Sequence, residues 1–295
     1  MKLIFPILLF LNTSLPGNGQ GITDQKSGLR VSVMNRDFPL LKILLPGQPE
    51  SDRGIEVEFP EHVTGVNKTN NQVEQLYFVT RGNQNKRTMP VWRVKGNTVI
   101  YETELQNKIH LTAKAILEPD GIKYTYIFTN HSGTAYTNLQ AVTCVKLYAV
   151  FSDTLLQRTY VHHPTGFELL AAETPERLSM PLNQWLPCRY LVSYTWPVPK
   201  QRMEKDEDGI TRYYKSKKTD LPLIATLSHD KKWVAATGSK DPGNLWTNPE
   251  RTCHHADMGV DLNKGETRTT TLKTFIYKGG VGKAKTLGEQ LLINN

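Results

Sequence analysis

Residues 109–130 are Ile-His-Leu-Thr-Ala-Lys-Ala-Ile-Leu-Glu-Pro-Asp-Gly-Ile-Lys-Tyr-Thr-Tyr-Ile-Phe-Thr-Asn. Both halves of this stretch are rich in β-branched and aromatic residues, which favour strands. Between them, Pro119-Asp-Gly121 has the composition of a turn, because proline fixes φ and glycine accepts a positive φ. The stretch therefore predicts an antiparallel hairpin with strands at 109–117 and 122–129.

Other short strands are expected on both sides of this hairpin, separated by turn residues. Helical periodicity is scarce, and 286–292 is the best candidate for a helix. Regularly spaced strands with little helix are typical of an all-β antiparallel sandwich. With no linker or internal repeat, residues 22–295 are expected to form a single β-sandwich domain. The other strands are expected at 29–34, 75–80, 98–105, 139–148 and 267–277.

The N-terminus has the pattern of a secretory signal. Lys2 precedes an apolar run from Leu3 to Leu11, and small and polar residues follow. The run is shorter than the ~20 apolar residues that cross a bilayer, and its order is that of a signal peptide. We expect a signal peptide at 1–21, a secreted or periplasmic location, and no membrane span.

The chain has a formal net charge of +8, spread along its length. Diffuse positive charge favours anionic polymers in general. A nucleic-acid partner is not expected, because the sequence has neither a recognition-helix pattern nor an RNA-binding aromatic signature. A carbohydrate is the expected partner, with an anionic polysaccharide as the natural charged example.

Three cysteines are present: Cys144, Cys188 and Cys253. An odd number allows one disulfide and one thiol, or three thiols. A core of this size needs no disulfide, so buried and mostly unpaired cysteines are expected.

Two stretches interrupt the regular spacing of strands. Residues 152–187 are long, polar and aromatic, and are expected to form an ordered loop that lines a site. Residues 201–220 are strongly charged, and are expected to form an exposed hairpin whose Tyr213 and Tyr214 pack back onto the rest of the protein.

Histidine pairs mark the candidate chemistry, in Tyr160-Val-His-His163 and Cys253-His-His-Ala-Asp257. Neighbouring residues of an extended strand point to opposite faces. Cys253, His255 and Asp257 therefore share one face, and His254 points the other way. In the first pair, the choice between His162 and His163 stays open.

These residues fit three interpretations. With His162 or His163, the side chains of His255 and Asp257 would give a nitrogen and oxygen ligand set for zinc or a similar ion. Alternatively, a histidine would act in proton transfer together with Asp257, Glu168 or Tyr160. In the third interpretation the histidines are structural. Neither pair has the helical spacing of a zinc-protease motif, and phosphate-binding and serine-hydrolase motifs are absent from the sequence.

Aromatic residues supply candidate sugar contacts. Tyr160 lies beside the first histidine pair in sequence, Trp185 lies close to Arg189, and Trp246 leads into the second pair. Concave sites lined by aromatic residues with a few polar groups are typical ligand sites. Trp196, which precedes Pro197, is expected in the core instead.

Several segments together resemble a known group. These are Pro222-Leu-Ile-Ala-Thr-Leu-Ser-His-Asp230, Trp246-Thr-Asn-Pro249 with the Cys-His-His-Ala-Asp stretch, and Glu118-Pro-Asp-Gly-Ile122. They are similar to secreted bacterial proteins of the galactose mutarotase-like group. The resemblance implies a β-supersandwich and a carbohydrate-related role. Mutarotases use a histidine and a carboxylate, and His255 is the nearest analogue of that histidine here.

The leading hypothesis is a secreted carbohydrate-binding or carbohydrate-active protein. Its alternatives are a metal-dependent, zinc-like hydrolase and a non-catalytic interaction module of the cell envelope. No cofactor is specified by the sequence. The candidate catalytic residues are His162, His163, His255 and Asp257, and the candidate substrate-binding residues are Tyr160, Trp185, Arg189 and Trp246.

Overall fold

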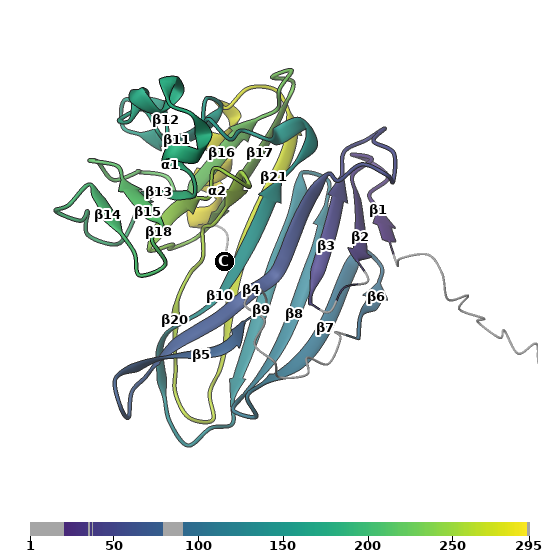
Figure 1. The fold of residues 1–295 in the computed structure, drawn as a ribbon. Coiled ribbons are helices and arrows are strands. Elements are labelled where there is room, and N and C mark those ends of the chain that lie inside the picture. The colour runs from purple at the N-terminus through teal and green to yellow at the C-terminus, as the bar shows by residue number, and fades with distance from the viewer. Residues whose placement is uncertain (1–20, 35, 37, 79–90, 294–295) are drawn as a thin grey trace, which may run out of the picture.

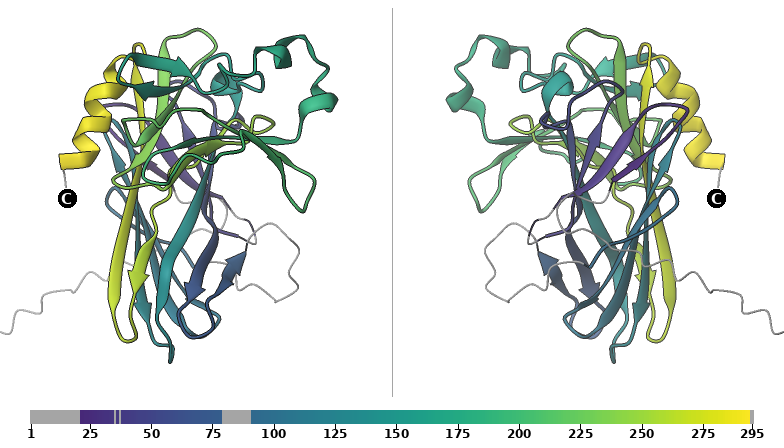
Figure 2. Two further views of the ribbon diagram at one scale, coloured as in Figure 1. Left: turned by 90° about the vertical axis from the view of Figure 1, so that its left-hand side faces the viewer. Right: turned by 90° about the vertical axis from the view of Figure 1, so that its right-hand side faces the viewer.

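The fold is known from a computed structural model that describes residues 21–34, 36, 38–78 and 91–293. Apart from Gly21, the expected signal peptide lies outside this range. Two large antiparallel sheets face each other, and a smaller sheet lies beside one end of them (Figures 1 and 2). The all-β antiparallel sandwich expected from the sequence is thus confirmed.

The first large sheet has eight strands in the described part of the chain. Its main path runs β1-β2-β3-β4-β10-β19, with β5 paired to β4 and β20 paired to β10. The strands are β1 (Gly21–Thr23), β2 (Arg30–Met34), β3 (Leu40–Leu44), β4 (Ile55–Asn67), β5 (Gln72–Phe78), β10 (Tyr136–Leu147), β19 (Cys253–His254) and β20 (Val260–Leu262).

The second large sheet has nine strands among the described residues, in the order β12-β11-β16-β17-β21-β9-β8-β7-β6. Its strands are β6 (Arg93–Lys95), β7 (Thr98–Leu105), β8 (Ile109–Glu118), β9 (Gly121–Asn130), β11 (Thr159–His163), β12 (Gly166–Leu169), β16 (Leu223–Leu227), β17 (Trp233–Ser239) and β21 (Thr267–Lys278).

The small sheet has the order β14-β15-β13-β18, and its β13–β15 pair is parallel. The helical segments are short and peripheral. The strands are β13 (Cys188–Ser193), β14 (Met203–Lys205), β15 (Thr211–Tyr214) and β18 (Asn244–Thr247). The helices are α1 (Leu182–Trp185), α2 (Lys283–Ile293), and the 3₁₀ turns η1 (Ala149–Phe151) and η2 (Pro175–Ser179).

The hairpin predicted from residues 109–129 is the pair β8–β9, in register from Ile109↔Asn130 to Glu118↔Gly121. Gly121 has φ +146°, and a Cβ at this position would lie 2.0 Å from the Thr274 carbonyl oxygen. Glycine is therefore required here both by its φ and by the close approach of β21. The expected strand at 75–80 is β5, which begins earlier, and residues 79 and 80 lie outside the described range.

The main core lies between the two large sheets. Alternate residues of β8 and β9 point into it, as the period of two predicts. Its centre is aromatic, with Phe59 of β4 against Tyr101, Tyr124 and Tyr126 of the facing sheet. A second cluster lies under α2, where Leu287 is buried, and a third lies between the small sheet and the 152–187 stretch.

Truncation of Phe128 tests the core assignment. This side chain on β9 is fully buried, so Phe128→Ala is expected to lower the free energy of unfolding by about 3–5 kcal/mol. Lys114 lies on the outer face of neighbouring β8, and Lys114→Ala should change stability by no more than about 0.5 kcal/mol. Denaturant unfolding of both variants measures the difference, and equal effects would contradict the assigned faces.

Candidate functional site

The second histidine pair has the alternation expected from the sequence. His255 Nε2 lies 3.2 Å from Cys253 Sγ, and His255 Nδ1 lies 3.8 Å from Asp257 Oδ2. His254 points to the opposite side, where its Nε2 lies 2.8 Å from Thr226 Oγ1. Cys253, His255 and Asp257 are therefore adjacent on one face, as predicted.

His254 is a structural residue of the interior. It is fully buried between threonines of β16 and β17, with Nδ1 3.3 Å from Thr237 Oγ1. Burial lowers the pKa of His254 to about 3, and the charge of His255 acts in the same direction. The imidazole is therefore neutral at physiological pH.

This burial predicts a pH-dependent loss of stability. The unfolded chain binds a proton at His254 near pH 6.5, whereas the folded chain does so only near pH 3, so stability falls as pH drops through this window. As the pH falls from 6.5 to 4, His254 should lower the free energy of unfolding by about 3 kcal/mol.

His254→Gln removes the titrating group and keeps a hydrogen-bonding side chain. Denaturant unfolding at a series of pH values should show a flatter acid limb for His254→Gln than for the unmodified protein. Parallel acid limbs would show that His254 is not held neutral.

On the other face, His255 lies against Trp246. The two rings stack with centroids 3.6 Å apart and an interplanar angle of 6°, and the two backbones hydrogen-bond to each other in both directions. This bridge joins β18 of the small sheet to the end of β19, and so connects the small sheet to the eight-stranded sheet.

The buried sulfurs determine the charge of His255. Burial alone would lower the pKa of His255, but the negative charge of Cys253 and the nearby carboxyl of Asp257 raise it to about 10. Burial would raise the pKa of Cys253, yet a hydrogen bond from Cys144 and the charge of His255 lower it. Cys144 itself is raised in pKa, chiefly by burial. Cys253 and His255 thus shift the pKa of each other toward the charged form, and Cys144 lies beside them.

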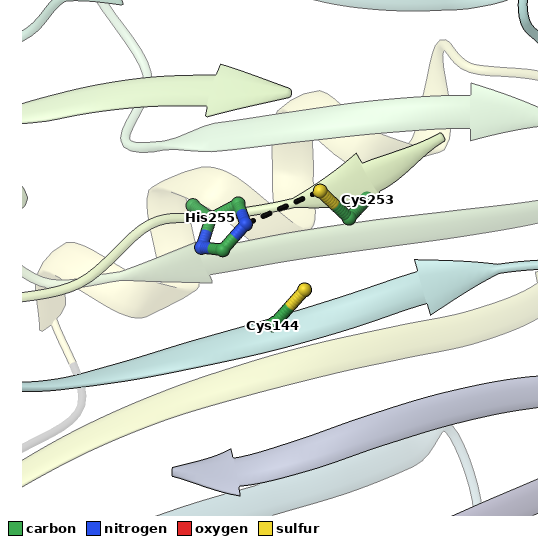
Figure 3. A group of neighbouring side chains, drawn as sticks. All are labelled: Cys144, Cys253 and His255. Atoms are coloured by element: carbon green, nitrogen blue, oxygen red, sulfur yellow. Dashed lines mark hydrogen bonds between the residues drawn. The ribbon is translucent and has the colours of Figure 1, made fainter. Parts of the chain in front are cut away.

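All three cysteines are free and buried, as expected. Cys144, on β10, lies beside Cys253 and His255 (Figure 3). One ligand atom from each of these three residues lies within 4.8 Å of the others. Among the described residues, this cluster is the grouping of potential metal ligands that includes His255. It contains neither Asp257 nor a histidine of the first pair, in contrast to the ligand set expected from the sequence.

A cavity of about 230 Å³ opens above Trp246, between the small sheet and the outer face of β4 and β10. It combines aromatic, cationic, amide and carboxylate side chains from both sheets. The lining residues are His62, Gln140, Val142, Arg189, Leu191, Trp196, Arg212, Gly243, Asn244, Trp246 and Asp257.

Two tryptophans form the aromatic part of this lining. Trp246 uses one ring face against His255 and also contributes to the cavity wall. Trp196 is 44% exposed, so its expected place in the core is wrong. Its ring lies directly over Gly243, where a Cβ would come within 2.2 Å of it, and its backbone N–H donates to the Gly243 carbonyl. The absence of a side chain at Gly243 is what admits the indole.

Two guanidinium groups form the cationic part. Arg189 Nη1 lies 2.9 Å from Glu250 and also donates to the Cys188 carbonyl. Arg212 Nη2 lies 3.3 Å from Asp206. Arg212 lies on the β14–β15 hairpin, which confirms the hairpin predicted in the 201–220 stretch, and the neighbouring Tyr213 stacks on Tyr190 with centroids 4.8 Å apart.

Asp257 and His62 are the other titratable groups of the cavity wall. Asp257 accepts a hydrogen bond from the Thr143 backbone N–H through Oδ1, whereas Oδ2 is buried and has no hydrogen bond from a described residue. The pKa of His62 is lowered, mainly by burial and against the charges of Glu61 and Asp257. A neutral imidazole and a carboxylate therefore face the same space.

The first histidine pair is placed elsewhere, and it does not line this cavity. His162 Nδ1 lies 2.7 Å from Asp220, and its ring packs edge-on against Phe167. His163 donates through Nδ1 to the Lys218 carbonyl and has Nε2 3.5 Å from Glu168. The two imidazoles thus have partners on β12 and in the 215–220 segment.

Tyr160 and Trp185 are also outside the cavity lining. Tyr160 packs against the cluster under α2, and Trp185 is 5% exposed in the cluster between the small sheet and residues 152–187. That stretch forms β11, β12, η2 and α1 rather than a loop lining the cavity. Of the predicted residues, Arg189, Trp246 and Asp257 line the cavity, and His255 lies behind Trp246. The roles of all eight predicted residues stay predictions.

Sequence reasoning missed His62, Gln140, Arg212 and Asn244. Each is a single polar residue on a strand and belongs to no motif. The outward position of Gln140 on β10 follows from strand alternation, but the sheet that covers that face does not.

No known protein-family model matches the chain, and no curated protein matches its sequence. Solved structures do resemble it. The Slr1438 protein of Synechocystis sp. PCC 6803 has a TM-score of 0.49 and 12% identity, over 94% of this chain and 100% of that protein. A galactose mutarotase-like protein from Lactobacillus casei has a TM-score of 0.49 and 9% identity, over 88% of this chain and 100% of that protein.

A galactose mutarotase-like protein from Clostridium acetobutylicum has a TM-score of 0.44 and 10% identity, over 88% of this chain and 96% of that protein. Two of these three proteins have the name of the group that the sequence resembles.

None of the helices in the described ranges has the length and apolar character needed to cross a membrane.

Proposed function

We propose that this protein binds a carbohydrate in the cavity above Trp246, and that the bound sugar is preferentially a uronate. The observation that carries the proposal is the composition of the lining. Two indoles lie beside two guanidinium groups, two amides and a carboxylate in one concavity. Sites that combine aromatic walls with a few convergent polar groups are typical of small-ligand binding.

The chemistry of each group matches one part of a sugar. The indole faces of Trp196 and Trp246 suit the C–H face of a pyranose ring. Gln140 and Asn244 each offer a donor and an acceptor for hydroxyl groups. A volume of about 230 Å³ is below the range of about 300–1,000 Å³ for drug-sized ligands, so the cavity suits one ring of a chain that continues outside.

The guanidinium groups favour an acidic sugar. Arginine presents five N–H donors in a planar fork that matches a carboxylate. Arg189 donates its hydrogen bonds through Nη1, to Glu250 and to the Cys188 carbonyl. Arg212 donates through Nη2 to Asp206, and its Nη1 lies 3.9 Å from Glu204. The overall charge of +8 would also attract an anionic polysaccharide. Export directed by residues 1–21, which we also propose, would place this site where such polymers occur.

Binding of glycans tests the site. Calorimetric titration with hexuronate oligosaccharides and with their neutral hexose counterparts should show tighter binding of the hexuronates. Trp196→Ala should weaken binding about tenfold or more, since tryptophans in well-packed contacts contribute strongly. Because Trp196 is 44% exposed, this change should leave the fold intact.

Trp233→Ala, at a partly buried tryptophan of β17 outside the cavity, is the matched control and should bind like the unmodified protein. If neither class of glycan binds, or if Trp196→Ala and Trp233→Ala have equal effects, the proposal fails. A non-catalytic interaction module of the envelope would then be the better description. Stronger binding of neutral sugars would refute the uronate preference alone.

Gly243→Ala tests the aromatic wall without removing an aromatic residue. The new methyl group would overlap the Trp196 ring, and the exposed indole should swing out of the cavity. Affinity for the same oligosaccharide should fall to that of Trp196→Ala, with little further loss in the double variant. Gly133→Ala, where a Cβ has open space, is the control, and an unchanged affinity of Gly243→Ala would show that Trp196 does not contact the sugar.

A further inference from the structure

Two cysteine sulfurs and a histidine nitrogen lie close together behind the Trp246 ring, and these three residues do not line the cavity. Cys144 is on β10 and Cys253 is on β19, and these strands pair with Val145 opposite His254 and Lys146 opposite Cys253. The same register brings Cys144 opposite His255. The two sulfurs and one imidazole nitrogen lie within 4.8 Å of one another, and the three residues are 0–1% exposed (Figure 3).

The orientation of His255 is fixed from two sides. Trp246 holds the plane of the ring by stacking, and Nε2 points at Cys253 Sγ at 3.2 Å. At the other edge, Nδ1 faces Asp257 Oδ2 at 3.8 Å, and Asp257 is held by the Thr143 backbone N–H. Metal-binding histidines commonly turn their second nitrogen toward a carboxylate in this way.

Carboxylates lie on the other side of Cys144. Oxygens of Glu58 and Glu61 share a second grouping with Cys144, again within 4.8 Å. Glu58 is 2% exposed. Its Oε1 accepts a hydrogen bond from Lys146 Nζ, whereas Oε2 has no hydrogen-bond partner among the described residues. A buried carboxylate with one oxygen that has no hydrogen bond from a described residue thus lies near Cys144.

We propose that Cys144, Cys253 and His255 bind a thiophilic metal ion, zinc(II) in the first place, through the two sulfurs and Nε2. Two thiolates and an imidazole are a ligand set preferred by zinc, which is usually four-coordinate. Glu58 or Glu61 supplies the fourth ligand. Two thiolates neutralise the dication, and Lys146 offsets the additional carboxylate.

Zinc binds cysteine as the thiolate and histidine as the neutral imidazole. Any proton held on the sulfurs of Cys144 and Cys253 or on Nε2 of His255 therefore leaves to solvent when the ion binds. In the metal-bound state, the Nδ1–H of His255 points toward Asp257.

The role of this ion is structural. The site is enclosed between β10, β19 and the Trp246 ring, and its two cysteines and its histidine are buried. The ion would therefore join the eight-stranded sheet to the segment that supports the small sheet. Structural zinc sites are closed in this manner, and their binding energy adds to folding. The proposal does not depend on sugar binding, and either can fail without the other.

Metal content and stability test the site. The mature protein is purified under reducing conditions, equilibrated with zinc and analysed for bound metal. We expect about one zinc per chain in the unmodified protein and in Cys188→Ala, and loss of this ion in Cys144→Ala and Cys253→Ala. Cys188 is equally buried but lies outside the cluster, so Cys188→Ala controls for the removal of a buried thiol.

Two measurements on the unmodified protein keep the test decisive if a variant does not fold. Removal of metal by a chelator should lower the melting temperature, and zinc, but not magnesium, should restore it. Cobalt(II) in place of zinc should give thiolate-to-metal charge-transfer absorption.

The proposal is overturned if the reduced protein takes up no zinc, or if Cys144→Ala and Cys253→Ala retain it. It is also overturned if thiol titration of the purified, unreduced and unfolded chain finds only one thiol. That result would show that Cys144 and Cys253 are joined in a disulfide instead.

Discussion

Strand β10 has both of its faces covered, and the rest of the molecule is arranged around this constraint. Its odd-numbered residues, among them Leu139, Ala141 and Val145, enter the core between the large sheets. Its even-numbered residues Gln140 and Val142 face the cavity, and Cys144 lies in the sulfur cluster. The period of two of a single strand thus separates the hydrophobic core from the polar chemistry. A shift of its register by one residue would exchange these two environments.

Trp246 lies between the cavity and the cluster of Cys144, Cys253 and His255. It pairs through its backbone with β13 in one direction and with His255 in the other. The indole lines the cavity and at the same time stacks on His255 of the Cys253–His255 pair. An isolated charge buried in this place would be strongly unfavourable, and the contact between Cys253 and His255 lowers that cost because each residue stabilises the charged form of the other.

Local sequence patterns predicted those structural features that depend on residues close together in the chain. The β8–β9 hairpin follows from its turn residues, and the shared face of Cys253, His255 and Asp257 follows from strand alternation. The sequence analysis expected both histidine pairs at one site, but the first pair lines neither the cavity nor the sulfur cluster, because proximity of distant segments depends on which strands pair. His162 is held by Asp220, far from it in sequence. Similarly, proximity to Pro197 did not predict the exposure of Trp196, which depends on contact with Gly243.

The β14–β15 hairpin supplies Arg212 to the cavity from the margin of the small sheet. Its outermost strand, β14, pairs with β15, and neither strand contributes to the core between the large sheets. The cavity wall therefore has one part that is free to vary in length and charge while the sandwich stays unchanged. In an evolving lineage, the charge of this wall can change at the exposed positions of the hairpin without a change in the core between the large sheets, much as antibody domains diversify through loops on a constant framework.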